Sequence, residues 1–115
     1  MKKQDTCRLL RGIINGIGQI SDLAEKYRYE DFYRDPQAHA TITGYIRTLA
    51  GYEREIPTII RVKFMLVPWK ELDLLEDAIS RTSPTDRPRL LWKYSTETLP
   101  QVRLLLDDML KDMEK

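Results

Sequence analysis

The sequence predicts an all-α protein, an antiparallel up-and-down bundle of four to five helices. Apolar residues recur at intervals of three and four over most of the chain, which is the spacing of amphipathic helices. The segments between these stretches are short, and short connections join antiparallel neighbours in a bundle. With 115 residues, of which 42% are hydrophobic and 32% charged, we expect a single domain over residues 1–115.

The first long helix is expected over residues 6–27, where a stripe of isoleucines and leucines recurs at helical spacing. Asp5 or Thr6 is the expected N-cap, because its side-chain oxygen can accept from the first free backbone N–H groups. Three glycines interrupt this helix, and each costs up to about 1 kcal/mol relative to alanine. Gly12 and Gly16 lie on one face, so we expect that face to pack closely against a neighbouring helix.

A short connector and a second long helix follow. Residues 29–33 predict a single turn or short helix that ends before Pro36, since a residue preceding proline is displaced from the α region. Residues 36–55 carry the second apolar stripe, which Pro57 ends. For residues 58–66 the spacing fits a strand about as well as a short helix, so both remain open.

The second half of the chain predicts two or three further helices. A third helix is expected from Pro68, which suits a first turn, to about residue 81 or 82. Residues 82–86 are Thr, Ser, Pro, Thr and Asp, which predicts a loop. A fourth helix is expected to start near Leu90, and Pro100 either kinks it or begins a fifth.

Charge and hydropathy exclude several classes of function. The formal net charge is +1, so no overall positive field would recruit nucleic acid or an acidic membrane. Charged and polar residues recur too often for a secretory signal or a membrane span. The lone cysteine, Cys7, excludes an intramolecular disulfide and fits a reducing compartment, so we expect a cytoplasmic protein.

The most specific motif is Val-Pro-Trp-Lys-Glu-Leu at residues 67–72, which Trp92 and Leu99-Pro100 follow downstream. This pattern, matched without insertion from about Arg28 to Leu106, resembles the HepT-like branch of the HEPN proteins. The resemblance implies a dimeric helical bundle that acts as a metal-independent ribonuclease. It also implies a small nucleotidyltransferase antitoxin that holds the ribonuclease inactive.

The resemblance breaks down at the family's catalytic signature. The family places an arginine and a polar residue on the helix after the tryptophan, then a histidine five positions after the arginine and a tyrosine two further on. In this chain those positions hold Glu76, Asp77, Arg81 and Ser83. RNA cleavage without a metal needs a group that titrates near neutrality and a cation for the phosphate. Arg81 stays protonated and Glu76 is an acid, so neither role is filled.

We therefore expect a catalytically inactive relative of the HepT-like toxins, which is not an enzyme and acts by protein binding. Its expected partners are a second copy of itself in a homodimer, a minimal nucleotidyltransferase, or a related active toxin. In this interpretation Asp77 and Arg81, at positions i and i+4, form an exposed ion pair on a helix with a structural role.

The best nucleic-acid candidate is the segment 81–93. Its net charge is +3, because a single aspartate opposes four cations: Arg81, Arg87, Arg89 and Lys93. Trp92 is interleaved with these cations, although its place in the family pattern favours packing in the core over stacking on a base. As an alternative function, an RNA-binding module built on this segment would lose affinity steeply as salt rises.

A second alternative is a ribonuclease toxin with a relocated site. That enzyme would use Arg81, Arg87 and Ser83, with His39 as a further candidate. His39 is the only histidine, and it lies beside the apolar stripe of its helix, which favours a surface or boundary position over a catalytic one.

Cofactor and metal sites are not expected. Asp73, Glu76 and Asp77 are spaced i, i+3, i+4 and could bring three carboxylates to Mg²⁺, but such a face is usually solvated. Cys7 has no histidine beside it, which argues against a nucleophilic role.

Overall fold

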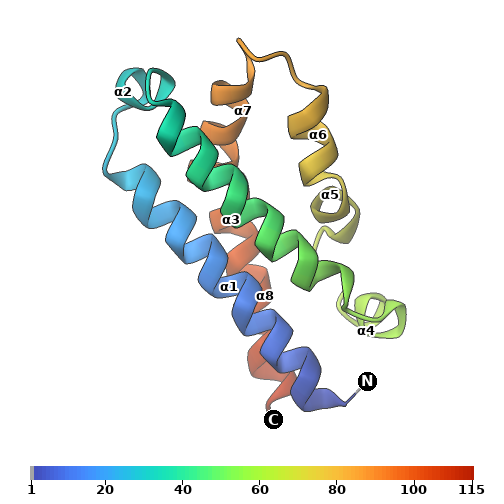
Figure 1. Cartoon of the computed structure of the whole chain (residues 1–115). Helices are drawn as coiled ribbons and strands as arrows, with labels where there is room; N and C mark the ends of the chain where they lie inside the picture. Colours follow the sequence, from blue (N-terminus) through green and yellow to red (C-terminus); the bar gives the residue numbers. More distant parts are fainter. Residues whose placement is uncertain (1) are drawn as a thin grey trace.

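The computed structural model, which describes residues 2–115, is an all-α bundle, so the predicted fold class is confirmed. Figure 1 shows two long helices side by side, α1 (Lys3–Glu25) and α3 (Pro36–Arg54), with α8 (Leu99–Met113) behind them. α1 makes its most extensive contacts with α3 and then with α8. The molecule is elongated, with extents of 44 × 26 × 20 Å. Among the described residues, no helix is long and apolar enough to cross a bilayer.

The core lies where these three helices meet. Each helix contributes the apolar stripe that its sequence spacing predicts. The fully buried large side chains are Leu10, Ile13, Ile17 and Ile20 of α1, Ile42, Ile46 and Leu49 of α3, and Leu99 and Leu106 of α8. Burying one such side chain contributes about 1.5–3 kcal/mol, so this contact is a main source of the stability of the bundle.

α1 begins earlier than predicted. Neither Asp5 nor Thr6 is its N-cap, because the helix starts at Lys3, and its N-cap Lys2 has an extended backbone and no side-chain capping bond. Asp5 lies instead in the first turn, where its negative charge interacts favourably with the positive end of the helix dipole. The end of the helix at Glu25 is two residues before the predicted one.

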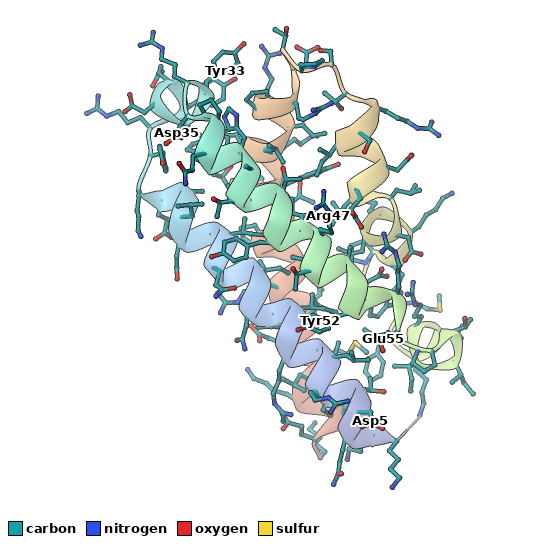
Figure 2. The ribbon with its side chains drawn as sticks, in the orientation of Figure 1. Asp5, Tyr33, Asp35, Arg47, Tyr52 and Glu55 are labelled. Carbon is teal, nitrogen blue, oxygen red and sulfur yellow. The ribbon has the colours of Figure 1, made fainter. Side chains whose placement is uncertain are left out.

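The α1 glycines lie at a helix contact, as predicted. A Cβ atom on Gly12 would be 2.9 Å from the ring of Tyr52 on α3, a residue labelled in Figure 2. A Cβ atom on Gly16 would be 3.5 Å from the side chain of Leu49, also on α3. A Cβ atom would therefore collide with the Tyr52 ring at Gly12, whereas at Gly16 it would make an ordinary van der Waals contact, so close approach of α3 requires glycine at Gly12 alone.

The connector α2 (Tyr29–Tyr33) lies where it was predicted, between the two long helices. Asp35 then caps α3, because its Oδ1 accepts from the backbone N–H groups of Gln37 at 3.0 Å and Ala38 at 3.1 Å. The Tyr27 hydroxyl donates to Asp35 Oδ2 at 2.6 Å. These hydrogen bonds hold the pKa of Asp35 below its ordinary value, and the bond from Tyr27 has the largest effect.

Residues 58–66, for which strand and helix were both open, contain a short helix, α4 (Thr58–Lys63), followed by turns. Ile60 of α4 and Phe64, its C-cap, are partly buried and pack against the core. Ile59 and Val62 face solvent, so the apolar residues of α4 divide between two sides of the helix.

The predicted third helix is broken in two, so the prediction of one continuous helix was wrong. The parts are α5 (Trp69–Asp73) and α6 (Leu75–Arg81), and Leu74 lies between them with φ −101° and ψ 2°. The Leu74 N–H bonds at 3.2 Å to the carbonyl of Glu71, three residues back, which tightens the last turn of α5 and ends it.

The last part of the chain is one continuous helical rod. α7 (Arg87–Lys93) begins three residues before the predicted start and leads through the π-helix η1 (Tyr94–Thr98) into α8. Pro100 has no N–H, and its ring would collide with the carbonyl four residues back in a regular α-helix. The wider π turn just before it, closed by the Leu99 N–H on the Tyr94 carbonyl, lets the rod pass through this proline.

Arg61 of α4 joins three helices through an ionic cluster. Its Nη1 lies 2.9 Å from Glu53 Oε2 of α3 and 3.0 Å from Asp73 Oδ1 of α5, and its guanidinium lies 5.2 Å from the centroid of the Trp69 ring. Glu53 is 1% exposed. Its pKa is raised to about 7, first by burial and then by a hydrogen bond with Asp73, while the charge of Arg61 acts in the opposite direction. Burial acts to raise the pKa of Asp73, but hydrogen bonds with Glu53 and Arg61 lower it overall.

The raised pKa of Glu53 predicts a pH-dependent stability. Its contribution is fully present below the ordinary pKa of 4.5 and is lost as the pH rises through about 7, because folding then requires a buried charge. We expect Glu53→Gln to remove this decline. Urea unfolding at pH 5 and pH 8 measures the change in the free energy of unfolding with pH. The matched control is Glu55→Gln, because Glu55 is an exposed neighbour, labelled in Figure 2. Equal pH dependence in wild type and Glu53→Gln would contradict the assignment.

Candidate functional site

Glu76 and Asp77, the first two positions that the resemblance assigns to the catalytic signature, form ion pairs. Glu76 on α6 lies 2.5 Å from Arg54 Nη2 and 3.8 Å from Arg47 Nε, so it joins α6 to α3. Asp77 Oδ2 lies 3.0 Å from Arg81 Nε, which confirms the predicted i, i+4 ion pair. Both members of that pair are at least half exposed, so it contributes little stability.

The last position of the signature forms a turn. The Ser83 hydroxyl donates to Asp86 Oδ2 at 3.1 Å and accepts from the Asp86 N–H at 3.2 Å. This reciprocal pair closes the loop between α6 and α7, which lies over the predicted residues 82–86. A role for Ser83 in a relocated site stays a prediction.

The three carboxylates of the candidate metal face pair with different arginines. Asp73 bonds to Arg61, Asp77 to Arg81, and Glu76 to the α3 arginines described above. Within residues 2–115, no group of three or more His, Cys, Asp or Glu side chains is placed to hold a metal ion.

The four cations of the segment 81–93 do not gather at one point. Arg87 points back to α6, where its Nε and Nη2 donate to the carbonyls of Ile79 at 3.1 Å and Thr82 at 3.0 Å. Arg89 lies toward α2, and a hydrogen bond to the Tyr29 oxygen is the main cause that raises its pKa. Lys93 is exposed one turn further along α7, and Arg81 is held by Asp77. Binding of RNA by these four residues stays a prediction.

A groove of about 480 Å³ between α3 and α7 contains a different constellation. Its polar lining residues are His39, Thr43 and Arg47 from α3 and Arg87 from α7. The α3 residues recur every four positions, so they lie along one face of the helix. The space beside Gly44 is open, because a Cβ atom there would meet nothing within 4 Å. Figure 2 shows Arg47 on the side of α3 that faces α6.

His39 is held with one ring nitrogen free. Its Nε2 lies 2.6 Å from the carbonyl oxygen of Phe32, and its ring packs at 63° on the Phe32 ring, with 4.9 Å between centroids. A carbonyl can only accept, so Nε2 carries the proton of this bond. In the described part of the chain, Nδ1 has no hydrogen-bond partner, and in the neutral ring it is an acceptor.

The groove therefore combines a candidate proton acceptor with cations. Imidazole is the side chain that most often transfers protons in catalysis, and guanidinium groups stabilise the charge that develops on a phosphate. Arg47 is 73% exposed, and its contact with Glu76 is long, so its donors remain accessible. Arg87 is held in place by its two carbonyl bonds.

The sequence interpretation named His39 and Arg87 as candidates for a relocated site and placed His39 at the surface or boundary, where it lies, but it did not group the two with Thr43 and Arg47. The local signal was the four-residue spacing of His39, Thr43 and Arg47 on one helix. Arg87 was a candidate for a relocated site because of its charge, but nothing in the sequence indicated that it lies in one groove with His39, from which 48 positions separate it along the chain.

Comparison with known proteins adds a functional likeness. The chain is similar to proteins named as RNases. One protein of Methanocaldococcus jannaschii, named "Putative RNase MJ1216", is 21% identical over 114 residues, covering 99% of this chain and 94% of its own. "Putative RNase MJ0125" of the same organism is 21% identical over 115 residues, covering 100% and 99%, and "Putative RNase MJ1380" is 23% identical over 103 residues, covering 90% and 94%. No protein-family model and no solved structure matches the chain.

These likenesses correct the expectation that the protein is not an enzyme. They run along essentially the whole chain, and the names of these relatives, putative RNases, point to a ribonuclease rather than to a non-enzymatic binding protein. The expectation was wrong because it was drawn from positions 76–83 alone. An imidazole and two guanidinium groups also line the α3–α7 groove.

Proposed function

We propose that the protein is a divergent HepT-like ribonuclease that cleaves RNA without a metal ion, with its reactive groups in the α3–α7 groove. The observation that carries this proposal is His39, which presents an unpartnered Nδ1 in a groove that two arginines also line. The likeness to proteins named as RNases supports the class of reaction. The motif at residues 67–72 supports the family assignment.

In the proposed reaction His39 acts as the general base. Its Nδ1 takes the proton from a ribose 2′-hydroxyl, and the 2′-oxygen forms a bond to the adjacent phosphorus. Arg47 and Arg87 stabilise the negative charge on the phosphate oxygens. The bond from phosphorus to the 5′-oxygen breaks, and that oxygen takes a proton from water or from the protonated ring. The products are a 2′,3′-cyclic phosphate and a 5′-hydroxyl end.

The test is cleavage of tRNA and of a structured RNA by the purified protein in EDTA. We expect cutting that persists without divalent cations, because His39 and the two arginines replace a metal. A matched substrate with 2′-deoxyribose at the cut position should stay intact, since it lacks the attacking hydroxyl. No cutting, a strict need for a metal, or equal cutting of the deoxy substrate would contradict the proposal.

The partners are part of the same proposal. An exposed apolar surface on α4 and the turn after it supports a protein partner, which we take to be a second copy of the chain. Its residues are Ile59, Val62, Met65 and Leu66. RNA is the second partner, as substrate. Action as a toxin, restraint by a minimal nucleotidyltransferase and a cytoplasmic location stay predictions that rest on the sequence.

A further inference from the structure

Glu76 contacts two arginines of α3 at once. Arg47 and Arg54 are seven positions apart, which is about two helical turns, so both project from the same side of α3. The Arg54 guanidinium donates to Glu76 Oε1 at 2.5 Å, whereas Arg47 Nε lies 3.8 Å from Glu76 Oε2. The carboxylate therefore binds Arg54 closely and Arg47 loosely.

The two members of the loose contact differ in their freedom to move. Glu76 is held beside α3, because its neighbours Leu75 and Ile79 on α6 are buried in the core. The Arg47 side chain is 73% exposed, against 30% for Glu76, and exposed side chains change rotamer rapidly. Arg47 can therefore leave Glu76, while Arg54 continues to neutralise that carboxylate.

Arg47 also lines the α3–α7 groove, where the proposed function requires it to bind the RNA phosphate. A carboxylate and a phosphate bind a guanidinium through the same N–H donors. The contact with Glu76 therefore engages a donor that the phosphate would use. The negative charge of Glu76 beside Arg47 would also repel an approaching phosphate.

We propose that Glu76 competes with the RNA phosphate for Arg47, and so weakens the binding of RNA without taking part in the chemical step. This inference rests on the proposed function, because it takes Arg47 as a phosphate ligand. Arg54 limits the competition, since it binds the same carboxylate more closely than Arg47 does. Glu76 is therefore a positioning residue that sets the affinity of the site.

The test is single-turnover RNA cleavage by the full chain over a range of protein concentrations. Glu76→Gln should lower the concentration that gives half the maximal rate by about two- to fivefold, the effect of one exposed ion pair, and leave the maximal rate unchanged. Arg54→Gln should raise that concentration, because Glu76 then binds Arg47 more strongly. When Glu76 is already glutamine, Arg54→Gln should have no effect.

The matched control is Glu55→Gln, which removes the same charge from an exposed position. Glu55 and Arg47, both labelled in Figure 2, are eight positions apart, or about 12 Å along the helix axis. At about 0.15 M salt this exceeds the screening length, so the control should behave as wild type. Affinity for the matched 2′-deoxy RNA separates the two proposals. If no variant cuts RNA but Glu76→Gln binds this RNA more tightly, the proposed function is wrong and the competition is supported.

Three results would overturn this proposal. The first is weaker binding or a lower maximal rate in Glu76→Gln, as the loss of a purely structural contact would give. The second is an affinity that Glu76→Gln and Glu55→Gln change equally, or not at all. The third is an equal effect of Arg54→Gln with and without Glu76, which would show that Arg54 contacts RNA directly. Circular dichroism shows whether each variant is folded, and Glu76→Asp, which shortens the side chain but keeps its charge, should give a smaller change in the same direction as Glu76→Gln.

Discussion

Replacing His39 by glutamine is expected to lower the rate of RNA cleavage by about 10²–10⁴-fold, the usual contribution of a general base. Glutamine retains an N–H donor that can replace the bond from Nε2 to the Phe32 carbonyl. It has no group that can take a proton from a ribose hydroxyl. The rate should therefore fall while the fold is retained. Single-turnover cleavage with protein in excess measures the chemical step directly.

The matched control for this variant is Arg8→Gln. Arg8 lies in the first turns of α1, its side chain is 78% exposed, and its contact is an ion pair with Asp5. It is outside the α3–α7 groove, so its replacement should leave cleavage unchanged. If His39→Gln cleaves RNA as fast as Arg8→Gln does, His39 is not the general base. The proposed site would then be wrong.

Replacing Phe32 by alanine is expected to destabilise the fold by about 3–5 kcal/mol, the usual cost of removing a buried phenylalanine. Phe32 has no exposed surface and is in ring contact with three neighbours: Tyr27 at 5.9 Å, His39 at 4.9 Å and Trp92 at 5.2 Å between centroids. Its removal leaves a cavity where α2, α3 and α7 meet. Urea unfolding measures the loss as a lower midpoint at an unchanged slope.

Phe32→Leu keeps most of the buried volume and provides a graded comparison. Phe32→Leu should lower the free energy of unfolding less than Phe32→Ala does, because the cavity it leaves is smaller. Loss of folding in Phe32→Ala, with a measurable decrease in Phe32→Leu, would agree with the prediction, since domains of this size are only about 5–15 kcal/mol stable. A decrease under about 1 kcal/mol in Phe32→Ala would contradict a core role for this ring.

Periodicity predicted the long helices well and the short ones poorly. α1 and α3 carry stripes of about six apolar residues, and each was located to within three residues. The break at Leu74 carries no such signal, because Trp69, Leu72, Leu75 and Ile79 keep helical spacing on both sides of it. The π turn before Pro100 was missed for a similar reason. A proline in a helical sequence predicts a kink or a break, but it does not predict which backbone conformation allows the helix to continue.

In the candidate site, too, contacts within one helix were predicted and contacts between helices were not. The Asp77–Arg81 pair was predicted because both residues lie on one helix, one turn apart. The α3–α7 groove was not predicted, because it depends on how the turn at residues 82–86 places Arg87 beside α3. The contact between Arg103 and Gly18 was not predicted either, because it joins α8 to α1, which are far apart along the chain.

The amino-acid pattern alone established the all-α class, the long helices and the contact of Gly12 and Gly16 with a neighbouring helix. These features depend on neighbours within about one helical turn, and such spacing can be read along the chain. Helix packing established which side chains lie together: His39 with Arg87 in one groove, and Arg47 with Glu76 between α3 and α6. Those contacts join segments far apart in sequence, so they exist only once the core has closed.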